Sequence, residues 1–187
     1  MNLISIALSW ILIVLAQCAS AQAAEQERAP TAQGTPPAGP EARIIDKWRG
    51  TWDVKAMRKY PQPAGAVTYT ETFEWVLDGR FLHSETSRKS DGSKEGGKSM
   101  SMFWYDILTK SYRYVIFDAA GFGMELPPPV WNEATQTMEW TSGMFSPISY
   151  TGHATFSDRD TIRWKSLLKD WKGTVVLEME GTSVRRK

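Results

Sequence analysis

Apolar and polar residues alternate along most of the chain after residue 50. In the segment 67–77, one face carries Val67, Tyr69, Phe73, Trp75 and Leu77. The other face is rich in threonine, and this period of two is the signature of a strand with one buried face. Similar segments, separated by turns rich in Gly, Asp, Asn and Pro, cover 80–88, 100–104, 111–118, 135–142, 149–157, 160–168 and 173–181. In the segment 100–104, Met100, Met102 and Trp104 share one face, and Trp104 is expected to face inward.

One short helix is expected in front of the strands. Ile44, Ile45 and Trp48 sit at helical spacing before Gly50, and helical periodicity is absent afterwards. A long meander hides its edges most simply by closing on itself. We therefore predict an all-β fold, a closed antiparallel meander barrel of about ten strands with a short N-terminal helix. A two-sheet sandwich is the alternative.

The stretch Gly50-Thr51-Trp52 stands at the start of the first strand. Glycine allows a backbone conformation that a Cβ would obstruct, and a tryptophan two residues later is large enough to close one end of a barrel. Both residues are expected to be structural.

Further short motifs follow in a fixed order: Gly79-Arg80-Phe81-Leu82, Tyr105-Asp106, Lys110-Ser111-Tyr112 and Val184-Arg185-Arg186. Together with Gly50-x-Trp52, they resemble an uncharacterised, mostly bacterial family of lipocalin-like (calycin-type) β-barrel domains. The resemblance covers most of residues 48–187, although Asp78 and Trp104 replace glycines usual in that family. It implies a barrel and a cavity but no activity. It also implies that Arg185 or Arg186 stacks on Trp52; Arg80 is a second candidate for packing on an aromatic ring.

The N-terminal residues differ in composition from the rest. Residues 1–23 carry no charged side chain, and the apolar run 3–16 is shorter than the ~20 residues that span a bilayer. The pattern predicts a signal peptide over 1–23, cleaved near Ala23, and a secreted or periplasmic protein. Residues 24–40 are predicted to be a flexible Pro/Ala-rich linker, and 41–187 the barrel domain. An uncleaved anchor, or a lipoprotein anchored through Cys18, are the alternatives.

Charge and composition exclude several classes of function. The formal net charge is +1, which gives no broad attraction for nucleic acid, and no membrane partner is expected unless Cys18 is lipidated. Cys18 is the sole cysteine, and His83 and His153 are the only histidines. Neither a Ser-His-Asp triad nor a zinc site has a recognisable arrangement. No cofactor is predicted; haem bound through one histidine is the alternative, suggested by related barrels.

One carboxylate breaks the apolar face of the strand 67–77. Alternation places Glu71 with Tyr69 and Phe73, where a charge is costly unless it is paired or hydrated. A β-bulge or exposure at the rim would explain it. The alternative is a cavity-lining Glu71 with Arg80 or Arg113 as its partner and Tyr114 or Tyr150 nearby. The predicted ligand-binding residues are Glu71, Phe73, Trp75, His83, Met102, Trp104, Tyr114 and Trp140.

The favoured hypothesis is a secreted β-barrel that binds or carries a small apolar or amphipathic ligand. An enzyme is the less favoured alternative, with Glu71 and either His83 or Arg113 as an acid–base pair. A filled barrel with a structural or partner-binding role is the third possibility, because aromatic residues fill a core as readily as they line a pocket.

Overall fold

The computed structural model describes residues 39–88, 98–119, 121–142 and 148–187, which belong to one unit, Gly34–Lys187. The predicted signal peptide and most of the predicted linker lie outside the described residues. Within the described part of the chain, no helix is long and apolar enough to cross a membrane.

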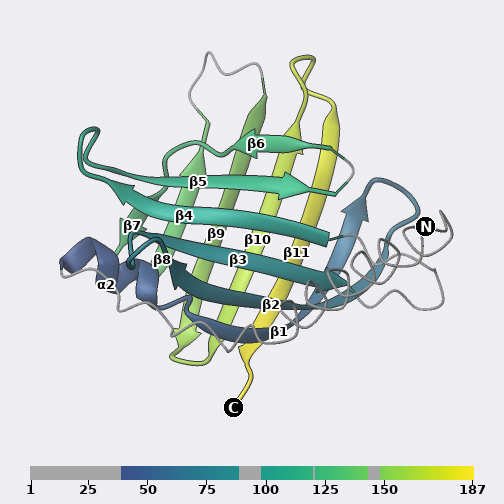
Figure 1. Cartoon of the computed structure of the whole chain (residues 1–187). Helices are drawn as coiled ribbons and strands as arrows, with labels where there is room; N and C mark the ends of the chain where they lie inside the picture. Colours follow the sequence, from purple (N-terminus) through teal and green to yellow (C-terminus); the bar gives the residue numbers. More distant parts are fainter. Residues whose placement is uncertain (1–38, 89–97, 120, 143–147) are drawn as a thin grey trace, which may run out of the picture. The chain divides into compact units, whose positions relative to one another are not determined.

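One helix and eleven strands make up the described residues (Figure 1). In chain order they are α2 (Pro40–Asp46), β1 (Gly50–Tyr60), β2 (Gly65–Val76), β3 (Phe81–Arg88), β4 (Lys98–Asp106), β5 (Ser111–Asp118), β6 (Gly123–Glu125), β7 (Val130–Asn132), β8 (Thr137–Thr141), β9 (Ser149–Asp158), β10 (Thr161–Lys169) and β11 (Val175–Arg185).

The strands form a single antiparallel sheet in the order β6-β5-β4-β3-β2-β1-β11-β10-β9-β8-β7. The sheet is a meander in which the first and last strands pair, with Trp52 opposite Arg185. It is curled, but β6 and β7 are its two edges and do not pair, so the fold is an open half-barrel. The predicted closure is therefore wrong at this seam. Pro127, Pro128 and Pro129 join the two short edge strands, and proline has no N–H to donate to a ladder.

The turn between β2 and β3 occupies residues 77–80, because Val76 pairs with Phe81. Leu77, Asp78 and Gly79 have φ values of 50°, 58° and 76°. Asp78-Gly79 alone would suggest a two-residue turn. The observed turn is longer, and three successive residues in it have positive φ values. Arg80 ends this turn and is exposed.

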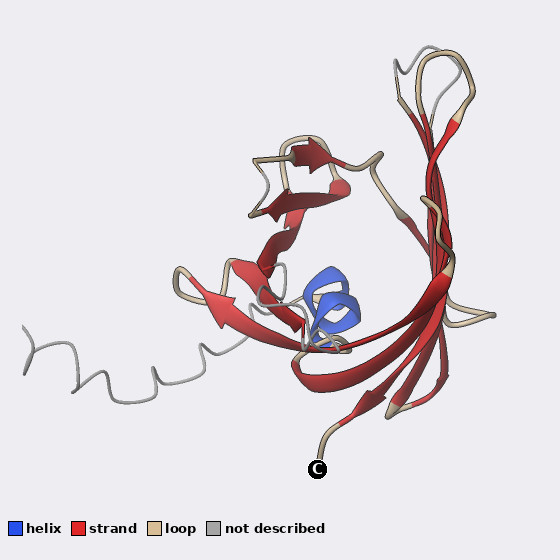
Figure 2. Ribbon diagram, turned by 90° about the vertical axis from the view of Figure 1, so that its right-hand side faces the viewer, coloured by secondary structure: helices blue, strands red, loops and turns tan. Residues whose placement is uncertain are grey.

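The helix α2 lies inside the curve of the sheet in Figure 2, and Trp52 is hydrogen-bonded to the residues that follow this helix. Trp52 is 1% exposed, and its Nε1 donates to the Trp48 carbonyl at 2.6 Å. The Arg185 guanidinium lies over the Trp52 ring, 4.1 Å from its centroid. Gly50 has φ 112°, and a Cβ there would lie 3.1 Å from the Arg185 guanidinium. Glycine is thus needed beside the stacked pair.

At Gly181 the backbone packs closely against the Trp164 side chain and the β1 backbone. A Cβ at Gly181 would lie 2.7 Å from Trp164 Cζ2 and 2.8 Å from the Lys55 carbonyl oxygen. We expect Gly181→Ala to lower the free energy of unfolding by about 1–3 kcal/mol, the usual range for overpacking, in a urea titration. Gly65→Ala is the control, because no heavy atom lies within 4 Å of the added Cβ. Equal stability of the two variants would contradict the close packing at Gly181.

Candidate functional site

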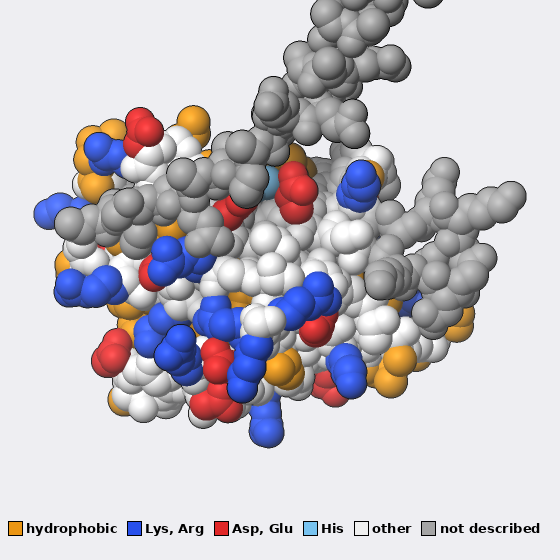
Figure 3. All heavy atoms as spheres, turned by 60° about the horizontal axis from the view of Figure 1, so that its bottom comes forward, with side chains coloured by type: hydrophobic (Ala, Val, Ile, Leu, Met, Phe, Trp, Pro, Cys, Tyr) orange, Lys and Arg blue, Asp and Glu red, His pale blue; other side chains and the backbone are white. Residues whose placement is uncertain are grey.

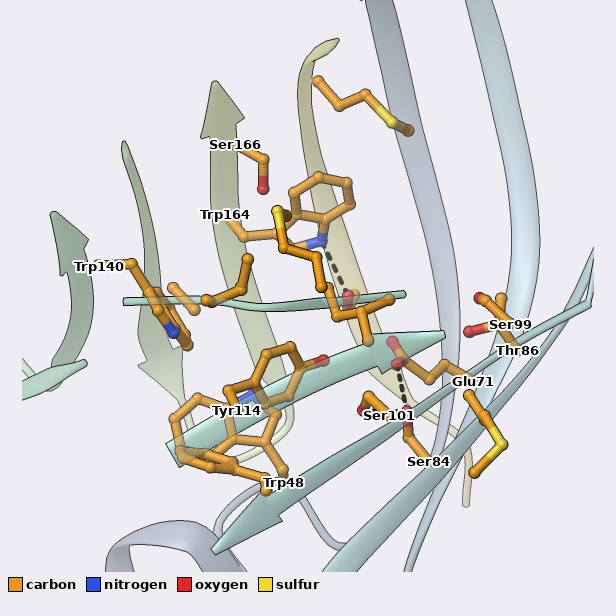
Figure 4. A pocket seen from close by; sticks show the side chains of 18 of the residues that line it. Trp48, Glu71, Ser84, Thr86, Ser99, Ser101, Tyr114, Trp140, Trp164 and Ser166 are labelled. Atoms are coloured by element: carbon orange, nitrogen blue, oxygen red, sulfur yellow. Dashed lines mark hydrogen bonds between the residues drawn. The ribbon is translucent and has the colours of Figure 1, made fainter. Parts of the chain in front are cut away.

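A cavity of about 340 Å³ lies inside the curve of the sheet. This volume falls within the range of small-molecule sites, roughly 300–1,000 Å³. Its walls are mostly apolar and aromatic, and a few polar side chains interrupt them (Figure 4). The aromatic side chains that line it are Trp48, Trp52, Tyr69, Phe73, Phe103, Tyr114, Phe122, Trp140, Tyr150 and Trp164.

Glu71 supplies the carboxylate of this cavity. It lies on the concave face of β2 between Tyr69 and Phe73, which also line the cavity. Ser84 Oγ donates to Glu71 Oε1 at 2.9 Å, and Ser84 Oγ lies 2.7 Å from Ser101 Oγ. The three side chains come from β2, β3 and β4, which are neighbours in the sheet. They form a row of hydrogen-bonding groups across one wall.

Burial raises the pKa of Glu71 to about 7, and the hydrogen bond from Ser84 opposes part of that rise. Part of the side chain remains uncovered, but that part faces the cavity. Burial removes part of the solvation of the charged carboxylate and so favours the neutral form. Near neutral pH the carboxyl group exchanges between its charged and neutral forms.

Tyr114 adds a phenol to the same wall. Burial and the nearby Glu71 charge raise the pKa of Tyr114, while its hydrogen bond with Ser101 lowers it in part. The effect of the Glu71 charge shows that the two groups are electrostatically close. Tyr114 thus stays a neutral hydrogen-bonding group at any physiological pH.

The opposite wall carries a second set of polar groups. Tyr150 Oη lies 2.9 Å from Ser166 Oγ, and Trp164 Nε1 donates to Ser183 Oγ at 3.1 Å. Trp140 Nε1 is buried and, within the described residues, has no hydrogen-bond partner. An amphipathic molecule in the cavity would therefore meet polar groups on both walls.

The structure brings four of the predicted ligand-binding residues to the cavity: Glu71, Phe73, Tyr114 and Trp140. Trp75 is buried elsewhere, and its Nε1 donates to Asp46 Oδ1 of the helix at 2.7 Å. The proposed site therefore does not include Trp75.

His83, Met102 and Trp104 lie on the convex face of the sheet. Ser84 and Ser101 face the cavity, and successive residues of a strand point to opposite sides. His83 pairs with Met102 across β3 and β4, so the two share that convex face. The site does not include these three residues either, and the inward face expected for Met102 and Trp104 is wrong.

The predicted site did not include Ser84 and Ser101, because the larger side chains of β4 were expected in the interior. The concave face of β4 instead carries Ser99, Ser101 and Phe103. Ser101 is 3% exposed and Ser84 is 1% exposed. The available signal was Glu71 itself, since a buried carboxylate needs short polar neighbours on the adjoining strands.

The acid–base pair considered from the sequence is not formed. His83 lies on the convex face, and Arg113 forms ion pairs with Glu125 and with Asp106, the latter at 3.7 Å. Arg80 is exposed in the turn after β2. His153 is also exposed. Among the described residues, no three His, Cys, Asp or Glu side chains are grouped as they would be around a metal ion.

Ser84→Ala should raise the pKa of Glu71 above about 7, because the Ser84 hydrogen bond favours the charged carboxylate. The titration of the Glu71 side-chain carbon in ¹³C NMR measures this. Ser166→Ala removes a hydroxyl from the opposite wall and should leave the Glu71 titration unchanged. An unchanged pKa in Ser84→Ala would show that the Ser84–Glu71 bond does not form in solution.

Comparison with known proteins places the chain by family and by fold. The family described as "Protein of unknown function (DUF1579)" matches residues 37–185. No relative was found among the curated proteins. The structure of Rv2717c from M. tuberculosis is similar, with a TM-score of 0.59 and 11% sequence identity over 81% of this chain and 100% of that one. The S-type phycobiliprotein lyase CPES from Guillardia theta gives a TM-score of 0.51 and 13% identity over 78% of this chain and 92% of that one. At these identities the likeness shows a shared calycin-like fold.

Proposed function

Because this chain belongs to the DUF1579 family, whose function is unknown, we propose its function from its own site: it binds or carries a small amphipathic molecule in the cavity of the curled sheet. The apolar walls would cover the body of the ligand, and the row formed by Glu71, Ser84 and Ser101 would orient its polar end.

The observation that carries this proposal is a hollow interior that contains a carboxylate. Protein interiors are packed as densely as organic crystals, so a volume of about 340 Å³ inside the sheet is an exception that provides room for a small molecule. A carboxyl group is rarely left inside an apolar wall, because its charged form loses solvation there. The two features together favour a binding site over a filled structural barrel.

The proposal is tested by blocking the cavity. Ser99 lines it, so Ser99→Phe should occupy part of its volume. Thr151 is exposed on the convex face of β9, and Thr151→Phe adds the same side chain outside the cavity. Native mass spectrometry of the protein, gently purified from its source, should show a retained small molecule in the natural protein and in Thr151→Phe. Loss of that molecule in Ser99→Phe alone supports the cavity. Retention in both variants, or no ligand in any of the three, contradicts the proposal.

We also propose that the chain is exported and acts outside the cytoplasm. Support comes from the sequence of residues 1–23, which has an uncharged apolar run followed by small residues at the expected cleavage positions. The mass of the mature protein tests this. Cleavage near Ala23 is expected; a diacylglyceryl group on Cys18 would contradict this cleavage position but not export, whereas an intact residue 1 would contradict the cleaved signal peptide.

A further inference from the structure

We propose, resting on the cavity being a ligand site as argued above, that its ligand is an organic cation: an amine or similar positive group on an apolar body, with the positive group against Glu71. The inference thus assigns a chemical class to the ligand and a role to the carboxylate.

Glu71 has no cationic partner within the described residues. No lysine, arginine or histidine there forms an ion pair with it, and Ser84 donates its hydrogen bond. Burial, rather than a neighbouring charge, is the main influence on its pKa. A buried carboxylate is ordinarily compensated by a positive charge. In the part of the chain that the structure describes, no cationic group occupies the place beside this carboxylate.

The basic residues next to the cavity point their charges away from it. Lys165 and His153 are paired across β10 and β9, on the convex face. The Lys165 ammonium lies 3.9 Å from Glu178 on that face, and His153 is exposed. The convex surface in general carries charges of both signs (Figure 3). A second carboxylate, Asp118, lines the cavity from β5. Lys165 and His153 also belong to the lining, but they occupy strand positions whose side chains alternate away from the cavity, so its inward-facing charged groups among the described residues are Glu71 and Asp118.

The walls around Glu71 suit a cation for a second reason. Trp52 lies directly opposite Glu71 in the β1–β2 register, and Phe73 and Tyr114 line the same cavity. The faces of aromatic rings carry negative charge density and attract cations, more strongly when the cation is desolvated. A carboxylate in a cavity lined by aromatic residues therefore favours an amine over a neutral group of the same shape.

The alternative is a neutral Glu71 that donates a hydrogen bond to a ligand carboxylate or carbonyl. The two ligand classes differ in how their affinity depends on pH. A cation binds the charged form of Glu71, so its affinity should rise as pH increases through about 7. A carboxylate would need the protonated form, and its affinity should fall over the same range. The other titratable groups at the cavity are Tyr69, Tyr114, Asp118 and Tyr150, with His153 and Lys165 on the outer side of its wall.

The test uses three probes that share a phenylalkyl body: 4-phenylbutylamine, 4-phenylbutanol and 4-phenylbutyrate. Isothermal titration calorimetry at pH 6 and pH 8 measures the affinity of each for the full chain, for Glu71→Gln and for Asp118→Asn. We expect the amine to bind at least tenfold more tightly than the alcohol at pH 8. The preference should shrink at pH 6 and disappear in Glu71→Gln. Asp118→Asn, the matched change at the other lining carboxylate, should reduce the preference less than Glu71→Gln does.

The outcomes separate this inference from the function on which it rests. Binding of the alcohol or the carboxylate at least as tightly as the amine would overturn the cationic ligand and leave the binding site standing. Loss of the preference in Asp118→Asn but not in Glu71→Gln would overturn the role of Glu71. Binding of none of the three probes would overturn the proposed function together with this inference. Thermal unfolding of each variant establishes that it is folded.

Discussion

Arg185→Ala should lower the free energy of unfolding by about 3 kcal/mol or more, since it removes several hydrogen bonds to partly buried groups. Arg185 Nη2 donates to the Lys47 carbonyl at 2.8 Å, Nη1 donates to the Arg49 carbonyl, and Nε donates to Asp160 Oδ1 at 3.0 Å. The same guanidinium lies over Trp52. It therefore ties the last strand to the end of the helix and to the tryptophan that closes the sheet.

A urea titration followed by circular dichroism measures this loss, with Arg186→Ala as the control. Arg186 is the neighbouring residue and is exposed; it pairs with Asp53 at the surface, where ion pairs contribute little to stability. Arg185→Lys should recover little, because an ammonium cannot reproduce the planar fork that reaches several carbonyls. Similar stabilities of Arg185→Ala and Arg186→Ala would contradict the role assigned to Arg185.

Glu71→Gln should stabilise the ligand-free protein at pH 8 by roughly 2–3 kcal/mol, since each pKa unit corresponds to about 1.4 kcal/mol. The pKa of Glu71 is about 7 in the folded protein, against 4.5 without its environment. The folded state therefore keeps the proton to higher pH than the unfolded state does. Its stability falls as pH rises from 4.5 to about 7 and is level above that. Glutamine keeps the oxygen that accepts from Ser84 and carries no charge.

Unfolding titrations at several pH values test this prediction. The difference between Glu71→Gln and the natural protein should vanish near pH 4.5 and grow to its full size near pH 7. Glu85→Gln is the control, because the Glu85 side chain on the neighbouring strand is 78% exposed. A destabilised Glu71→Gln at pH 8, or a difference independent of pH, would show that burial does not dominate at Glu71.

Period-two alternation was sufficient to predict an all-β meander and the short leading helix. It also placed Glu71 on the same face as Tyr69 and Phe73, as the structure has it. The closure of the sheet was not predictable in this way. Whether β6 and β7 pair depends on the path of the connection 126–129, and the alternation within a strand contains no information about which strand it pairs with.

The candidate site was harder to predict than the fold. In β4, Trp104 and Met102 are more apolar than Ser99 and Ser101, and a pattern that assigns apolar residues to the interior reverses the faces. Ser84 and Ser101 face inward, where Ser84 is hydrogen-bonded to Glu71 and to Ser101. These hydrogen bonds connect three neighbouring strands. Such a network depends on register between strands, which the sequence alone leaves open.

The most direct test of the proposed site is the ¹³C titration of the Glu71 carboxyl group, with and without 4-phenylbutylamine. We expect the pKa of Glu71 to be near 7 in the free protein and to fall markedly when the amine is added, because a bound cation stabilises the charged form. A pKa near the ordinary 4.5 that does not respond to the amine would mean that Glu71 faces solvent, and the proposed site would be contradicted.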